Sequence, residues 1–222
     1  LYYNKIISRI KNSNKFVISK GHGEVIYFSV LCDLKYFNKK KLFEHYRSGD
    51  CYLGGHVSHK INGVEFSTGS LGHGLSYSVG LAHADKINNN DRKIFCLHGD
   101  AELNEGSVWE AAVYAANKKL NNLIVLVDCN KIGSSDFTKN YISNECLALN
   151  WKGLGWNIDH CDGHNFQSIN KTIKKNMKSK KPTVIILDTL KGNGVSFIEN
   201  DPIWHVKGLD DKSYLKALKE IK

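Results

Sequence analysis

Two side chains with oxygen atoms that could bind a metal ion, Asp100 and Asn130, lie thirty positions apart in this sequence. Asp100 closely follows a short apolar run at 93–97, and Asn130 closely follows another at 123–127. If these runs are neighbouring parallel strands, their carboxyl ends meet at one edge of the sheet, and the two side chains lie close together. A carboxylate and an amide oxygen suit a hard cation such as Mg²⁺. Phosphate oxygens and water would complete its coordination shell. The same residues could instead cap helices or turns, and their spacing alone favours neither interpretation.

The sheet that would position these residues is predicted by the alternation of short β-rich runs and helical stretches from about residue 90 onward. Such alternation is typical of α/β proteins. We therefore expect a doubly wound, mostly parallel sheet flanked by helices, in a single domain over residues 1–222. The N-terminal third is expected to be mostly helical. The predicted strands are 93–97, 123–127, 156–161 and 183–187, and the predicted helices are 23–34, 75–87, 105–118, 166–177 and 211–221.

Dinucleotide binding uses the same architecture, but the glycine pattern argues against it. G-x-G begins at Gly21, Gly72 and Gly192, yet in each case a large residue stands where the G-x-G-x-x-G/A fingerprint requires a small one. The sequence also contains no phosphate-binding loop of the form G-x-x-x-x-G-K-[ST].

Composition excludes several other classes. With 41% hydrophobic and 24% charged residues the chain is globular, and its apolar runs are too short to span a bilayer. The net charge is +9, but only Arg9, Arg47 and Arg92 are arginines and the lysines are scattered. That pattern is more typical of a solvated surface than of a nucleic-acid-binding face, which stays an alternative. The six cysteines include no C-x-x-C pair, which argues against a zinc ribbon. Their pattern fits a protein of a reducing, cytoplasmic compartment.

The segment His98-Gly99-Asp100-Ala101-Glu102, followed by Asn130, resembles the thiamine-diphosphate motif, in which G-D-G precedes an asparagine by about 25–30 residues. Seven further motifs occur in the order found in transketolase, so the chain resembles the diphosphate-binding half of that family from about residue 15 to its end. These motifs are S-K-G-H at 19–22, G-G-H at 54–56, S-T-G-S-L-G-H-G at 67–74, E-G-S-V-W-E-A at 105–111, D-G-H at 162–164, L-K-G-N-G at 190–194 and W-H-V-K at 204–207.

The resemblance implies roles for individual residues. Mg²⁺, for which Ca²⁺ or Mn²⁺ could substitute, would be held by the side chains of Asp100 and Asn130 and by the backbone carbonyl of Ile132. Histidines close to cofactor and substrate would be catalytic, and two glutamates would link the active sites across a subunit interface. The implied cofactor-binding residues are Lys20, Leu71, Gly72, Gly99, Asp100, Ala101, Asn130 and Lys191, the catalytic ones are His22, His56 and His205, and the interface relay is Glu105 and Glu110.

The resemblance also implies an activity and a partner. Transketolases move a two-carbon ketol unit from a ketose phosphate to an aldose, and a second domain binds the pyrimidine ring of the cofactor. The resemblance covers neither that domain nor the family's N-terminal helix. We therefore expect the N-terminal subunit of a split transketolase, active only with a C-terminal partner subunit in a heterotetramer of two plus two, with no nucleic acid or membrane as partner.

The sequence departs from the family pattern at Ala101, which replaces the second glycine of G-D-G, at His73, where the family usually has glutamine, and at Val206, where it has glycine. If position 101 requires a positive φ, the methyl group costs on the order of 1 kcal/mol, and if φ is negative little changes. Two alternatives follow. The chain could be a degenerate protein that binds the cofactor without turnover, or another thiamine-diphosphate carboligase, similar to deoxyxylulose-phosphate synthase.

Overall fold

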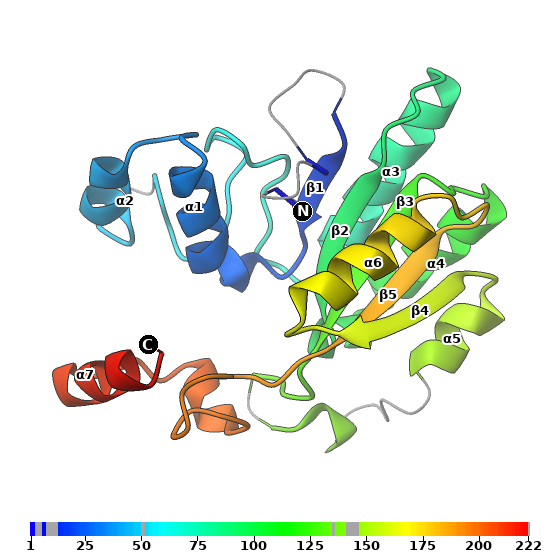
Figure 1. Ribbon diagram of the computed structural model, residues 1–222. Helices are drawn as coiled ribbons and strands as arrows, with labels where there is room; N and C mark the ends of the chain where they lie inside the picture. Colours follow the sequence, from blue (N-terminus) through cyan, green and yellow to red (C-terminus); the bar gives the residue numbers. More distant parts are fainter. Residues whose placement is uncertain (3–5, 8–12, 50–51, 135, 141–146, 222) are drawn as a thin grey trace.

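A computed structural model describes residues 1–2, 6–7, 13–49, 52–134, 136–140 and 147–221. Its centre is a sheet of five parallel strands in the order β1-β2-β3-β5-β4 (Figure 1). The strands are β1 (Lys15–Ile18), β2 (Ile94–Gly99), β3 (Leu123–Cys129), β4 (Asn157–Asp162) and β5 (Thr183–Asp188). The central strands are almost continuously apolar, as expected for parallel strands that are covered on both faces.

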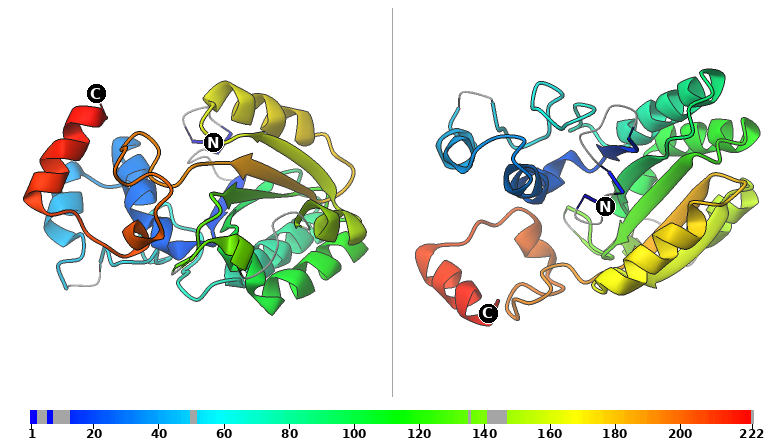
Figure 2. Two further views of the ribbon diagram at one scale, coloured as in Figure 1. Left: turned by 90° about the horizontal axis from the view of Figure 1, so that it is seen from below. Right: turned by 45° about the horizontal axis from the view of Figure 1, so that its top comes forward.

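Successive side chains of each strand enter two different cores. On β3, Leu123 and Val125 pack with the helices α3 (His73–Ile87), α4 (Gly106–Asn117) and α5 (Leu147–Gly153). Ile124 and Leu126 point to the opposite face, which is covered by α1 (Glu24–Asp33) and α6 (Phe166–Asn176). Helix α2 (Lys39–His45) lies beside α1, while α7 (Asp211–Glu220) lies well away from the sheet (Figure 2). The predicted doubly wound parallel sheet flanked by helices is confirmed.

The predicted elements from residue 90 onward are confirmed to within two residues at each end. The N-terminal third, predicted to be mostly helical, differs because it also contributes the edge strand β1 and a long irregular stretch between α2 and α3. The helices α2 and α5 were not predicted either, and each contains only seven residues. Among the described residues no helix is both long and apolar enough to cross a membrane. Four cysteines are buried free thiols, namely Cys32, Cys96, Cys129 and Cys161, while Cys51 and Cys146 lie outside the described part of the chain.

Candidate functional site

A cleft of about 620 Å³ lies at the carboxyl ends of the strands, where ligands bind in open parallel sheets. Residues from the ends of β1, β2 and β3 line it, together with segments that follow β5. The cleft gathers most of the residues singled out from the sequence: Lys20, His22, His56, Leu71, Gly99, Asp100, Ala101, Glu105, Asn130, Ile132, Lys191 and His205.

Asp100 and Asn130 come together because β2 and β3 are adjacent, as their spacing predicts. The Asp100 carboxylate accepts hydrogen bonds from the backbone N–H of Ala101 (2.8 Å) and of Lys131 (2.6 Å), so it connects the turn after β2 to the turn after β3. The Asn130 side-chain oxygen accepts from the N–H of Ile132 at 3.0 Å. Burial raises the pKa of Asp100, and the neighbouring Asp128 adds to the effect. A cation beside this carboxylate would therefore be stabilising.

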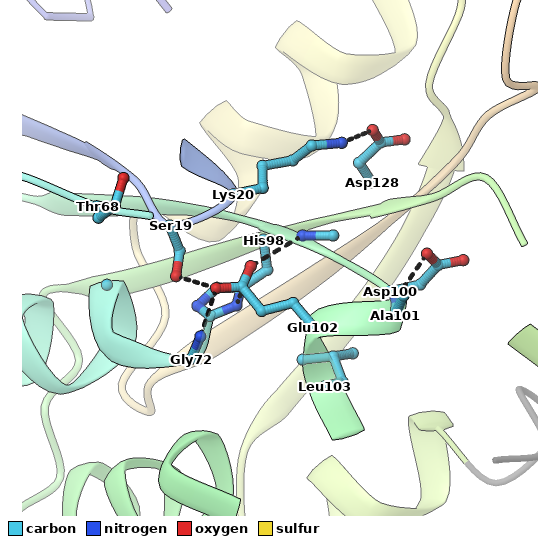
Figure 3. Close-up of polar contacts among 12 residues, drawn as sticks. Ser19, Lys20, Thr68, Gly72, His98, Asp100, Ala101, Glu102, Leu103 and Asp128 are labelled. Atoms are coloured by element: carbon cyan, nitrogen blue, oxygen red, sulfur yellow. Dashed lines mark hydrogen bonds and ion pairs between the residues drawn. The ribbon is translucent and has the colours of Figure 1, made fainter. Parts of the chain in front are cut away.

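Asp128, the next-to-last residue of β3, forms a second polar centre beside the first. It accepts hydrogen bonds from Lys20 Nζ at 2.5 Å and from the Thr189 hydroxyl (Figure 3 shows the pair with Lys20). Burial alone would raise the pKa of Asp128, but Lys20 and the hydrogen bonds to the carboxylate lower it. The pair thus holds the Lys20 ammonium group at the cleft.

Cationic and imidazole groups dominate another side of the cleft. Lys191 Nζ is 3.1 Å from His205 Nδ1, and the rings of His205 and His22 have centroids 5.4 Å apart. Burial and then the charge of Lys20 lower the pKa of His22 to about 4. Burial and then Lys191 lower the pKa of His205, and burial and then Lys20 lower that of Lys191. An anionic ligand would relieve this repulsion, so the cleft can bind a cation and an anion side by side.

Comparison with known proteins identifies the family to which this chain belongs. Residues 4–221 match the family described as "Transketolase, thiamine diphosphate binding domain". The chain belongs to the transketolase family. It is 42% identical over 208 residues to one subunit of the apulose-4-phosphate transketolase of Actinobacillus succinogenes, covering 93% of this chain and 75% of that one. The transketolase of Homo sapiens is 32% identical, with 96% of this chain and 34% of the human one covered. The crystal structure of transketolase from Campylobacter jejuni superposes with a TM-score of 0.89 at 30% identity, over 95% of this chain and 34% of that one.

The predicted family, the transketolase-type transferase class and the thiamine-diphosphate-binding domain are confirmed by these matches. Relatives that are themselves named as single subunits of a transketolase agree with the predicted N-terminal subunit. This chain spans about one third of the length of the human and C. jejuni transketolases that it matches.

Two of the three departures from the transketolase pattern, Ala101 and Val206, replace glycine at positions where the backbone does not require it. Ala101 opens the 3-10 helix η2 (Ala101–Asn104) and is not among the described residues with positive φ, so its methyl group causes no backbone strain. Val206 has φ −121° and is 80% exposed. His73 is the exposed first residue of α3 and does not line the cleft.

Two predicted site residues lie outside the cleft lining. Gly72 has φ 82°, and its N–H donates to the Glu102 carboxylate at 2.8 Å, which stabilises the turn that precedes α3. A Cβ atom at Gly72 would lie 2.5 Å from the Ser107 hydroxyl oxygen. Glu110 is exposed on α4, one turn beyond Glu105, which lines the cleft. The roles assigned to individual residues stay predictions.

Sequence reasoning missed Asp128, Thr189 and the buried pair His98–Glu102. Burial would raise the pKa of Glu102, but His98 and the hydrogen bonds to Glu102 lower it to about 2. The ring of His98 is fully buried, which would lower its pKa, but Cys96 and Glu102 raise it to about 10. Their place in the sequence could have indicated them, because each of these residues except Glu102 lies at or just beyond the end of a central strand.

Proposed function

We propose that this chain is the N-terminal subunit of a two-component transketolase that transfers a two-carbon ketol unit from a ketose phosphate to an aldose. The observation that carries the proposal is the cleft, in which Asp100 and Asn130 face the same space as Lys20 and Lys191. Relatives named as individual transketolase subunits support a partner chain, which would supply the pyrimidine-binding domain in a complex of two plus two in the cytoplasm. Two of these relatives are named for apulose-4-phosphate, which is therefore the first donor to test.

The donor set fits a magnesium-bound diphosphate. Asp100, Asn130 and the carbonyl of Ile132 would supply one carboxylate and two neutral oxygens, which suit Mg²⁺, Ca²⁺ or Mn²⁺. Among the described residues no cluster of three His, Cys, Asp or Glu side chains could hold a metal ion by itself. Diphosphate oxygens would complete the shell, while Lys20, Lys191 and the backbone N–H groups near Gly99 and Ala101 would balance the negative charge.

The histidines suit proton transfer to and from sugar oxygens. Thiamine diphosphate, when bound, supplies the carbon centre that carries the two-carbon unit. His22 and His205 have lowered pKa values, so their rings are neutral at physiological pH and can accept a proton from a hydroxyl group. His56 lines the same cleft and is exposed, so it can contact a substrate.

The side of the cleft next to α4 suits a contact with a second thiamine-diphosphate site. Glu105 lines the cleft and is exposed, and Glu110 is exposed on the first turns of the same helix. A hydrogen-bonded relay between two active sites would need carboxylates with this accessibility.

The test is reconstitution. The chain, its partner and the 1:1 mixture are each assayed for ketol transfer with thiamine diphosphate and Mg²⁺, using a panel of ketose phosphates that includes apulose-4-phosphate. We expect turnover only in the mixture, and loss of that turnover in Asp100→Asn but not in Asp91→Asn, an exposed aspartate that does not line the cleft. Turnover by the isolated chain would contradict the division of the site between two subunits.

Calorimetric titration separates this proposal from the degenerate alternative. A degenerate chain would bind thiamine diphosphate weakly in the reconstituted complex and would support no transfer with any donor. The negative φ of Ala101 argues against that alternative, because the backbone N–H at this position remains available and is not displaced by strain. A mobility-shift assay with DNA addresses the remaining alternative of nucleic-acid binding, which predicts steeply salt-dependent affinity.

A further inference from the structure

Glu102 is a buried carboxylate at the edge of the cleft, and the proposed reaction assigns it no role. It is the second residue of η2, and only 1% of it is exposed. Its Oε1 atom accepts hydrogen bonds from the Ser19 hydroxyl and from the N–H of Gly72 at 2.8 Å, and its Oε2 atom accepts from the N–H of Gly99 at 3.2 Å (Figure 3). One carboxylate therefore joins three segments that are far apart in the sequence.

Each of the three donors is followed or preceded by a residue that lines the cofactor cleft. Ser19 precedes Lys20 at the end of β1, Gly72 follows Leu71 at the start of α3, and Gly99 precedes Asp100 at the end of β2. We propose that Glu102 is a positioning residue that fixes these three loops relative to one another and thereby sets the affinity of the cleft for its magnesium-bound diphosphate. This inference deepens the proposed function and rests on it.

His98 is the ionisable side chain that lies against the buried Glu102 carboxylate. It lies on β2 with 0% exposure, and its Nδ1 atom is 3.1 Å from Glu102 Oε2, an ion pair that is not aligned as a hydrogen bond. Because removing one partner of a buried pair leaves an uncompensated charge, the two residues depend on each other. Both carboxylate oxygens of Glu102 are thus engaged by the protein itself.

Close packing around the carboxylate means that a local shift would be transmitted to the cleft. A Cβ atom at Gly74, in the first turn of α3, would lie 2.5 Å from the Ser19 hydroxyl oxygen, so the helix start and the end of β1 are in direct contact. The Thr68 hydroxyl also donates to the carbonyl of Ile18 at 2.8 Å. The loops cannot move separately without breaking these contacts, and Glu102 lies at their centre.

The substitution Glu102→Gln tests the proposal in the reconstituted complex. Both carboxylate oxygens act as acceptors, so an amide must place its NH₂ group against a donor whichever way it is oriented. If the cost of one unsatisfied buried donor is passed on to the cleft, it corresponds to a loss of affinity of about tenfold. We expect the Kd for thiamine diphosphate, measured calorimetrically with Mg²⁺, to rise by about that factor, while kcat at saturating cofactor stays within about threefold because Glu102 acts through the loops that it joins.

Asp85→Asn is the matched control. Asp85 is also 1% exposed and pairs with Arg92 at 2.5 Å, but it lies thirteen residues into α3, about 18 Å along the helix from the cleft. This variant should lose thermal stability and keep the cofactor Kd unchanged. Hydrogen exchange gives a direct readout of loop position: Glu102→Gln should speed exchange in peptides covering 69–75 and 96–101 but not 82–88, and Asp85→Asn should show the reverse pattern.

The proposal is overturned if Glu102→Gln loses stability but binds thiamine diphosphate within twofold of the unsubstituted complex, since the carboxylate would then serve the fold alone. If Glu102→Gln does not fold, Ser19→Ala takes its place, because it removes one donor and keeps the carboxylate. A rise of about threefold in Kd is then expected, and an unchanged Kd contradicts the proposal. Failure of the unsubstituted complex to bind thiamine diphosphate at all would instead refute the proposed function.

Discussion

Ala101→Gly restores the glycine that the family motif carries next to its metal-binding aspartate, and we expect it to destabilise the protein without improving its site. Ala101 begins η2 with a negative φ, and its N–H donates to the Asp100 carboxylate at 2.8 Å. Glycine at a helical position costs about 0.5–1 kcal/mol relative to alanine, because more backbone freedom is lost on folding. For a domain of about 200 residues this corresponds to a decrease in Tm of about 1–4 °C.

The change in stability and the change in cofactor affinity are measured separately. Thermal unfolding of the purified variant gives the change in Tm, and calorimetric titration of the reconstituted complex gives the Kd for thiamine diphosphate in the presence of Mg²⁺. Because the backbone N–H at position 101 is present in both proteins, we expect the two Kd values to agree within about twofold. The control is Ala148→Gly in the first turn of α5, which should lower Tm by a similar amount and is outside the cleft.

A Kd at least tenfold lower in Ala101→Gly than in the unsubstituted complex would refute this reasoning. It would mean that the methyl group obstructs the diphosphate, and that the position requires glycine for close approach and not for its φ angle. A rise in Tm would refute the other half, because it would require the alanine to be strained.

Three further predictions concern the charges and turns around the cleft. Lys20→Met leaves the largely buried Asp128 without its ion-pair partner, so we expect a loss of about 1–3 kcal/mol in the free energy of unfolding and a cofactor Kd raised at least tenfold; an unchanged Kd would contradict a role in anion binding. The pKa of His22 in the apo chain, about 4 and thus below its unfolded value near 6.5, means that His22 contributes to a loss of stability as pH falls from about 6.5 to 4; NMR titration should show this pKa and its increase after diphosphate binding. Gly72→Ala places a Cβ atom 2.5 Å from a side-chain oxygen at φ 82° and should lower the free energy of unfolding by about 2–4 kcal/mol. Its control is Gly80→Ala in the helix that follows, where the added Cβ atom meets no atom within 4 Å and should stabilise the protein by about 0.5–1 kcal/mol. Both values are measured by chemical denaturation.

The fold was predictable from sequence where the local signal was strong. The runs that became β2, β3 and β5 are apolar along nearly their whole length, and helix α4 between β2 and β3 buries Val108, Ala112 and Ala115 on one face. Strand β1 was missed because it has only four residues and its pairing with β2 depends on residues about eighty positions away. The seven-residue helix α2 begins with three consecutive lysines, which indicate a solvated segment and carry no apolar period.

The site was predictable for residues that protrude from strand ends or belong to a glycine-rich motif. The proximity of Asp100 and Asn130 follows from the geometry of parallel strands, whereas their assignment as metal ligands, the histidines and Lys191 needed the family resemblance. Glu102 could not be found in this way, because its burial depends on donors 83 and 30 positions away. In the sequence it is one of several carboxylates in a polar turn.

The turn after β3 has an unfavourable backbone conformation that orients the two oxygen-bearing side chains of the site. Lys131 has φ 66°, a left-handed conformation that costs a non-glycine residue about 1–2 kcal/mol. That conformation directs the N–H of Lys131 to the Asp100 carboxylate at 2.6 Å, while the next N–H, of Ile132, reaches the Asn130 side chain at 3.0 Å. The two oxygen-bearing side chains are thus oriented by consecutive backbone groups of one turn. Such a turn is tolerated where hydrogen bonds offset its strain, and here both hydrogen bonds are made to the two side chains proposed to hold the metal ion.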